Sequence, residues 1–207
     1  MITTEISRRP VLHRKALRTR RTLIVLGVDG SGKSTAVAAL VHALKQQDLP
    51  AQQVANPAAR KWLNQRVAYS RFEISPATQD GIESMFRLFN VARNTIKSSL
   101  FSGVTVMDRH LACQLALRQV RGLPQGRFFR WLALAYAKDA DVVVLDVGAD
   151  TAYSRIHQRG EDTETKEFLE ASRNAYLELA AKHNWTVLSS AQSIDGVVDE
   201  LLAVLDK

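Results

Sequence analysis

The chain has 207 residues, of which 46% are hydrophobic and 24% are charged. This balance is typical of one soluble globular domain and excludes a disordered or fibrous protein. No apolar run approaches the roughly 20 residues that a membrane helix needs, so we expect no membrane contact. The single cysteine, Cys113, has no partner for an internal disulfide, which favours a cytoplasmic chain.

The positive charge is concentrated at the N-terminus. The net charge is +7, and residues 1–21 carry seven basic side chains against Glu5 alone, a net +6. We therefore expect a flexible basic arm over 1–21 and a nearly neutral folded domain over 22–207. The arm is either a solvated terminus or a contact for nucleic acid or another polyanion. Because the domain is nearly neutral, nucleic acid is not its expected partner. No apolar stretch follows Arg8 and Arg9, which argues against a secretory signal.

Strand and helix patterns alternate along the domain. Leu23 to Leu26 is apolar throughout, as a buried parallel strand is, and Val37, Leu40 and Leu44 recur at helical spacing. The alternation predicts an α/β fold of three layers, with a mainly parallel five-stranded sheet flanked by helices. Strands are predicted over 22–26, 51–55, 104–107, 141–147 and 185–189. Helices are predicted over 34–47, 58–69, 81–101, 111–120, 128–137, 149–158 (with Asp150 as N-cap), 166–183 and 194–205. Loops are predicted over 70–78 and 159–165.

A glycine-rich segment follows the first strand and fits the phosphate-loop pattern G-x-x-x-x-G-K-[ST]. Glycine lets backbone N–H groups approach a polyphosphate, Lys33 adds a cation between the outer phosphates, and Ser34 offers a hydroxyl to Mg²⁺. The positive end of the following helix points at the same anion. The sequence therefore predicts that Mg²⁺ and ATP bind here, with the ATP at Gly27, Asp29, Gly30, Ser31, Gly32, Lys33, Ser34 and Thr35.

Three further segments accompany the phosphate loop and its internal Asp29. They are Leu88-Phe89-Asn90-Val91-Ala92-Arg93, Val106-Met107-Asp108-Arg109-His110, and Arg155 to Glu161 with Glu164, Phe168 and Tyr176 beyond it. In this order and spacing, the chain from about Thr22 to its C-terminus resembles the bacterial thymidylate kinases, which are P-loop nucleoside monophosphate kinases. The resemblance implies a P-loop NTPase fold with a small lid at about 157–165. It also implies phosphate transfer from ATP to dTMP, giving dTDP, and a homodimer.

Phosphoryl transfer between two phosphates gathers negative charge, so catalysis needs cations more than a general base. The predicted catalytic residues are Lys33, Arg109, Arg155 and Arg159. Arg109 follows a strand, at the edge of the sheet where ligands bind, and the resemblance implies that it grips the acceptor phosphate. Arg155 and Arg159 lie four apart on one helix face, where they either close over the transferring phosphate or form a solvated surface. Asp108 either holds Mg²⁺, through water, or orients Arg109.

The resemblance also assigns residues to the acceptor nucleotide. It places the base near Phe89 and Arg93, which lie four apart on one helix face, although Phe89 equally fits an apolar stripe facing the core. It implies that Asp29 reaches the acceptor sugar or the arginines around it. The alternative for Asp29 is a carboxylate that faces solvent.

The acceptor side departs from the family pattern. The family's Arg-Glu-Pro or Phe-Pro segment is Ala55-Asn56-Pro57-Ala58-Ala59-Arg60 here, in which Arg60 would supply a cation while the carboxylate and glycines are gone. The family's tyrosine and glutamine after Asp-Arg are Leu117 and Arg118, which removes a hydrogen bond and adds a charge to the acceptor pocket. Thr163 stands where the lid often has an arginine. Since acceptor discrimination rests on a few hydrogen bonds, ATP use is better supported than the choice of dTMP.

Three functions therefore remain open. The first is a nucleoside monophosphate kinase acting on dTMP. The second is a kinase for a hydroxyl acceptor, such as a nucleoside or other small metabolite, with Asp29 or Asp108 as the base. The third is a nucleotide-dependent nucleic-acid-binding or regulatory module that uses the basic arm. The sequence has no Asn-Lys-x-Asp run, which excludes a switch GTPase, and 207 residues are too few for a large motor ATPase.

Overall fold

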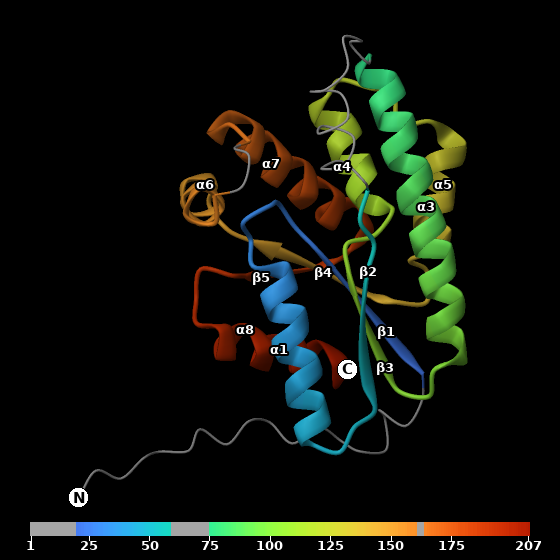
Figure 1. The fold of residues 1–207 in the computed structure, drawn as a ribbon, viewed down its shortest axis with the longest axis vertical. Helices are drawn as coiled ribbons and strands as arrows, with labels where there is room; N and C mark the ends of the chain where they lie inside the picture. Colours follow the sequence, from blue (N-terminus) through green and yellow to red (C-terminus); the bar gives the residue numbers. More distant parts are fainter. Residues whose placement is uncertain (1–19, 59–74, 161–163) are drawn as a thin grey trace, which may run out of the picture.

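The computed structural model describes residues 20–58, 75–160 and 164–207. In these residues a five-stranded sheet in the order β2-β3-β1-β4-β5 forms the middle layer, and every strand pair is parallel (Figure 1). This confirms the predicted α/β fold. The strands are β1 (Arg21–Leu26), β2 (Ala51–Ala55), β3 (Val104–Asp108), β4 (Asp141–Asp146) and β5 (Thr186–Ser189).

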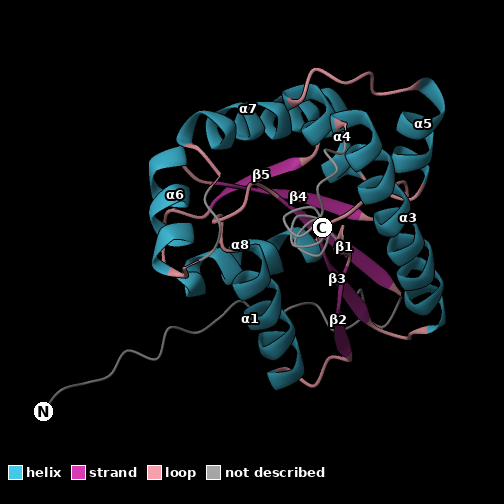
Figure 2. Ribbon diagram, turned by 45° about the horizontal axis from the view of Figure 1, so that its top comes forward, coloured by secondary structure: helices cyan, strands magenta, loops and turns pink. Residues whose placement is uncertain are grey.

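Helices cover both faces of the sheet (Figure 2). One face is covered by α1 (Lys33–Gln46) and α8 (Ile194–Leu205). The other is covered by α3 (Pro76–Leu100), α4 (Ala112–Val120), α5 (Arg127–Ala135) and α7 (Lys166–His183), with α6 (Ala149–Gln158) packed beside α7. The described residues contain no helix that is long and apolar enough to cross a membrane.

The central strand β1 explains why the sheet is buried on both sides. Successive side chains of a strand point to opposite faces. Leu23 and Val25 therefore pack under α1 and α8, while Ile24 and Leu26 pack under the helices of the other face. All four side chains are completely buried, as an apolar run without alternation requires.

Most predicted elements lie within two residues of their observed bounds, but three local predictions are wrong. The helix α3 begins inside the predicted loop 70–78, because Ser75 caps it by accepting from the Thr78 N–H at 3.2 Å. The N-cap of α6 is Gly148, so Asp150 lies in the first turn instead. Arg21, counted with the arm, belongs to β1 and forms a 3.0 Å ion pair with Asp141.

Several predictions fall outside the described residues. They are the basic arm over residues 1–19, the helix over residues 59–69 together with Arg60, and the part of the lid at residues 161–163. The described parts of the lid are residues 157–160, at the end of α6, and residues 164–165, directly before α7.

The strand order places the functional segments together. β1 lies between β3 and β4, so the chain reverses its direction of winding at β1. In open parallel sheets, ligands bind at the carboxyl ends of the strands beside such a reversal. The phosphate loop follows β1, and Asp108 ends β3. Both therefore reach the same edge.

Candidate active site

The phosphate loop runs from the end of β1 to the start of α1, and its glycines adopt positive φ. Gly27, Gly30 and Gly32 have φ of 139°, 82° and 81°. At Gly30 a Cβ would lie 2.4 Å from the main-chain O of Ala152 in α6, so the backbone conformation and the close contact both require glycine. Gly32 is the N-cap of α1 and makes no side-chain cap. The first amides of α1 are therefore oriented as donors toward an anion.

Lys33 is buried under the loop that is expected to hold the phosphates. Its Nζ donates to the main-chain O of Val28 and lies 3.4 Å from Ser31 Oγ and 3.8 Å from Asp29 Oδ1. The pKa of the Lys33 ammonium is lowered to about 8, first by burial and then by the charge of Arg109, while the Asp29 carboxylate opposes both.

The structure brings together Ser34 and Asp108, the two residues predicted to hold Mg²⁺. Ser34 Oγ donates to Asp108 Oδ2 at 2.5 Å. The other carboxylate oxygen of Asp108 is buried and has no hydrogen-bond partner in the part of the chain that the structure describes. Hydroxyl and carboxylate oxygens suit Mg²⁺, which in kinases completes its octahedral shell with phosphate oxygens and water. The donor set therefore fits the ion, and Asp108 directs its side chain to Ser34 rather than to Arg109.

Arg109 reaches from the end of β3 back to the phosphate loop. Its guanidinium forms an ion pair with Asp29. Burial lowers the pKa of Arg109, but the Asp29 carboxylate, together with Cys113 and Tyr176, acts in the opposite direction, and the pKa lies above its ordinary value. Asp29 thus contacts an arginine of the expected acceptor side, which agrees with the hypothesis that Asp29 reaches the acceptor sugar or the arginines around it.

The helix α6 brings both lid arginines to the loop. Arg155 Nη1 donates to the main-chain O of Gly30 at 3.4 Å, and its Nη2 donates to the main-chain O of Ser190 at 3.2 Å. Arg159 is exposed, and its Nε donates to the main-chain O of Arg155 at 3.1 Å. One arginine is therefore fixed against the loop, while the other is available at the solvent edge.

A pocket of about 380 Å³ lies between the phosphate loop, the end of α6 and the connection from β5 to α8. Sequence reasoning missed the part contributed by residues 190–197. The signal was available, because these residues follow β5 and the carboxyl ends of parallel strands share one edge. The pocket is lined by Gly30, Ser31, Gly32, Thr35, Ala36, Leu145, Arg155, Gln158, Arg159, Ser190, Gln192, Ile194 and Val197.

Comparison with known proteins agrees with this arrangement. The family model described as "Thymidylate kinase" matches residues 25–201. The chain belongs to the thymidylate kinase family. It is 26% identical over 189 residues to a "Probable thymidylate kinase" of Archaeoglobus fulgidus, covering 89% of this chain and 94% of that protein. It is 27% identical over 193 residues to a "Thymidylate kinase" of Fervidobacterium nodosum, covering 87% and 95%.

A third relative is the "Thymidylate kinase" of Vibrio vulnificus, at 25% identity over 205 residues, covering 92% of this chain and 96% of that protein. The family confirms the predicted class of enzyme, a P-loop nucleoside monophosphate kinase, and the predicted use of a nucleotide substrate. The identities are low, so the acceptor side has to be judged from this chain's own contacts.

The segment from Leu88 to Arg93, which resembles the base-binding segment of thymidylate kinases, lies on α3 with Phe89 and Arg93 facing away from the core. Phe89 is 66% exposed and Arg93 is exposed as well, so the alternative in which Phe89 packs in the core is wrong. The two side chains do share one face of α3, but that face is opposite to the buried one. The buried face carries Asp80, Glu83, Ser84, Arg87, Val91, Asn94 and Ser98.

The buried face of α3 meets α4 through charged and amide groups. Arg118 Nε donates to Asp80 Oδ2 at 2.7 Å, and its guanidinium lies 3.9 Å from the centroid of the Phe129 ring. Asp80 therefore offsets the charge that Arg118 is predicted to add to the acceptor pocket. Leu117, one position earlier, is half-buried and supplies no polar group.

Arg87 and Gln114, which sequence reasoning did not select, meet at the centre of this interface. Arg87 is 3% exposed, and its Nη1 donates to Gln114 Oε1 at 3.1 Å. Its Nε is buried without a hydrogen-bond partner among the described residues, and so is Nε2 of the neighbouring His110. Burial lowers the pKa of His110 to about 3, and the charge of Arg87 acts in the same direction. A periodicity search overlooks Arg87, because a buried arginine has no apolar pattern.

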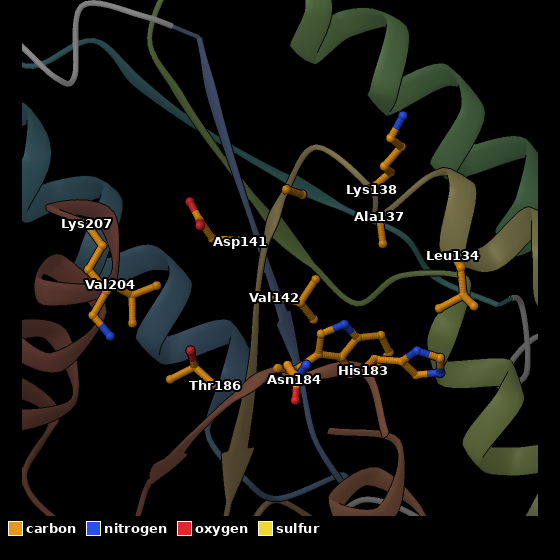
Figure 3. A pocket seen from close by; sticks show the side chains of 12 residues that line it. Leu134, Ala137, Lys138, Asp141, Val142, His183, Asn184, Thr186, Val204 and Lys207 are labelled. Carbon is orange, nitrogen blue, oxygen red and sulfur yellow. The ribbon is translucent and has the colours of Figure 1, made fainter. Parts of the chain in front are cut away.

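A second cavity, of about 400 Å³, lies at the opposite edge of the sheet (Figure 3). It surrounds the amino-terminal starts of β4 and β5, with Asp141 and Val142 on one side and His183 and Asn184 on the other. No residue of the phosphate loop lines it. Although it is the larger of the two cavities, the thymidylate kinase chemistry belongs at the other edge.

The pKa of Lys33 generates a test of the nucleotide site. Phosphates beside Lys33 stabilise its charged form, so ATP binding should raise a pKa that starts at about 8. Binding should take up about half a proton at pH 8, and ATP affinity should fall as the pH rises above that value. Isothermal titration calorimetry in two buffers of different ionisation enthalpy measures the uptake. A binding enthalpy that is the same in both buffers contradicts the assignment, and Lys33→Met is the control that should abolish the uptake.

Proposed function

We propose that this chain transfers the terminal phosphoryl group of ATP to dTMP, giving dTDP and ADP, with Mg²⁺ as cofactor. The observation that supports it best is the pairing of Arg109 with Asp29, which brings the acceptor-side cation to the phosphate loop beside Lys33. A phosphate acceptor is already an anionic nucleophile, so its attack needs charge neutralisation and alignment rather than a base. Family membership supports the same acceptor.

The chain's own residues have distinct roles in this proposal. The loop amides and Lys33 hold the outer phosphates of ATP. Ser34 and Asp108 would hold Mg²⁺, which would neutralise part of the negative charge of those phosphates. Arg109 binds the phosphate of the acceptor. Arg155 lies against the loop and Arg159 at its solvent edge, and both cover the transferring group and exclude water. The cations together stabilise the charge that spreads over the transition state.

The hydroxyl-acceptor alternative receives less support from the contacts. A base must be ready to take a proton from the hydroxyl. Asp29 is engaged by Arg109 and lies 3.8 Å from Lys33, while Asp108 accepts from Ser34. Both carboxylates are thus committed to cations or to the metal ligand set.

The experiment that tests the function is ADP release from ATP and Mg²⁺ over a panel of acceptors. The panel contains dTMP, dUMP, other monophosphates, thymidine and other nucleosides. We expect dTMP to stimulate turnover most, and Lys33→Met to remove at least ~99% of it, since the loss of one transition-state cation costs about 10²–10³-fold. A nucleoside that stimulates more strongly than every monophosphate would establish the hydroxyl-acceptor alternative.

We further propose that the acceptor base is bound by Arg87 and Gln114 rather than by Phe89 and Arg93. The support is the buried Nε of Arg87, which has no hydrogen-bond partner within residues 20–58, 75–160 and 164–207, since a buried donor is rarely left without an acceptor. The carbonyl of a pyrimidine base is such an acceptor. Arg87 also lies on the side of α3 that faces α4, where Gln114 fixes one of its other nitrogens.

Two matched arginine variants distinguish these assignments. Arg87→Met should raise the KM for the acceptor by about tenfold or more, because a hydrogen bond from a charged donor is worth about 1.5–3 kcal/mol. Arg93→Met should leave that KM within about twofold, as substitutions of exposed residues usually do. The KM for ATP should be unchanged in both. Steady-state kinetics on protein whose thermal unfolding matches wild type measures the effect. If Arg93→Met raises the acceptor KM more than Arg87→Met does, the acceptor base is bound by Phe89 and Arg93 instead.

We also propose that two copies of the chain pair through the exposed face of α3. Large apolar side chains gather there, and apolar patches rimmed by polar groups mark contact surfaces. Met85 is 63% exposed, Ile96 63% and Leu100 77%. Phe89 shares this face, which accounts for its exposure.

The dimer has a simple test. Ile96→Asp places a charge in the proposed contact and should give a monomer, whereas wild type should sediment as a dimer. Val187→Asp, on β5 and 44% exposed, is the control and should leave the dimer intact. Analytical ultracentrifugation at several concentrations measures both. A monomeric wild type, or a dimer that survives Ile96→Asp, contradicts this interface.

A further inference from the structure

A single buried asparagine connects β2, the end of β3 and α3. Asn56 follows β2 and is completely buried. Its side-chain Nδ2 donates to the main-chain O of Arg109 at 2.7 Å, and its Oδ1 accepts from Asn94 Nδ2 at 2.9 Å. Its main-chain N–H donates to the main-chain O of Asp108 at 3.0 Å. Both polar atoms of the Asn56 side chain therefore have partners within the fold. Of the three hydrogen bonds of this residue, two are made to main-chain oxygens of the Asp-Arg segment.

The residue that Asn56 holds has an unusual backbone. Arg109 has φ of 69°, in the left-handed region that disfavours side chains with a Cβ. Such a conformation persists only where the surroundings fix it. Two hydrogen bonds do so here. The Arg109 N–H donates to the main-chain O of Val25 at 3.1 Å, and the Arg109 carbonyl accepts from Asn56.

The backbone conformation determines where the Arg109 side chain points. The direction of a Cβ follows from φ and ψ, so a return to ordinary helical or extended backbone would swing the guanidinium away from Asp29. We propose that Asn56, itself held by Asn94, is a positioning residue that keeps Arg109 left-handed and so aims its guanidinium at the phosphate loop. This inference rests on the proposed function, in which Arg109 binds the acceptor phosphate.

The two partners explain why an amide stands at this position. The Arg109 carbonyl needs a donor, and the Asn94 amide nitrogen needs an acceptor. An amide side chain supplies both, whereas an ionised carboxylate only accepts. The family pattern often has a glutamate before this proline, and Asn56 takes its place here. At this position the chain therefore contributes a fixed backbone rather than the charge of a carboxylate.

Asn56→Ala tests the role, and Asn90→Ala is its matched control. Asn90 lies on the same helix as Asn94 and donates to the main-chain O of Pro57 at 3.0 Å, so its loss removes a similar connection without touching Arg109. Asn56→Ala should lower kcat with dTMP by roughly 10- to 100-fold, as small misplacements of an aligned cation do, with ATP affinity unchanged. Asn90→Ala should stay close to wild type. Equal effects in the two variants overturn the proposal.

A second readout needs no acceptor and separates this proposal from the proposed function. The side-chain Nε–Hε resonance of Arg109 in a ¹⁵N–¹H spectrum, assigned by its loss in Arg109→Lys, reports on the guanidinium environment. Asn56→Ala should shift or broaden that resonance, and Asn90→Ala should leave it in place. If the resonance is unchanged in Asn56→Ala, Asn56 does not position Arg109, whatever the acceptor proves to be.

Asn56→Asp keeps the test decisive if the alanine variant does not fold. A protonated carboxyl can donate to the Arg109 carbonyl and accept from Asn94, while the ionised form cannot donate. Burial raises the pKa of such a carboxyl. As the pH falls from about 8 to about 6, toward the ordinary pKa range of carboxyl groups, the protonated fraction of the new side chain grows. The ratio of variant to wild-type kcat should therefore rise. A ratio that is flat across this range overturns the proposal.

Discussion

The concentration of positive charge at one edge of the sheet is the constraint on which this site depends. Lys33 is buried, and Arg109 and Arg155 are directed at the same loop. Like charges so close together raise the free energy of the folded state unless an anion lies between them. Asp29 provides that anion, since it pairs with Arg109 and lies 3.8 Å from Lys33. An acidic residue inside the phosphate loop thus acts as a counter-ion for Arg109 and Lys33.

The sequence predicted best those parts in which one strong local constraint acts. The amphipathic run of α7 predicts its exact range, and the structure shows that Thr165 caps the helix directly before that run. Ser193 caps α8 in the same way. The phosphate loop was predicted because its glycines serve backbone geometry and ligand approach together. In each case the controlling residues lie within a few positions of the structure that they determine.

The face of α3 was not predictable in this way, because its pattern is inverted. Helical periodicity correctly places Phe89 and Arg93 on one face of the helix. The same periodicity, however, expects apolar residues on the side that faces the core. In α3 the inward side carries Asp80, Glu83 and Arg87, while Phe89 and its apolar neighbours are exposed. A polar inward face is stable only if partners satisfy it. Those partners lie 27 to 38 residues away along the chain, where a local pattern gives no information.

The same long-range contacts bear on the departures from the family pattern. Arg118 stands where the family has a neutral residue, but it forms an ion pair with Asp80, which offsets its charge. Asn56 replaces a carboxylate, but it comes with Asn94, so both polar groups of the new side chain are satisfied. These two departures are thus each paired with a residue on α3. Compensated changes alter how the acceptor side is built while leaving Arg109 aimed at the phosphate loop. The sequence departures therefore argue less against dTMP than they do when each is considered alone.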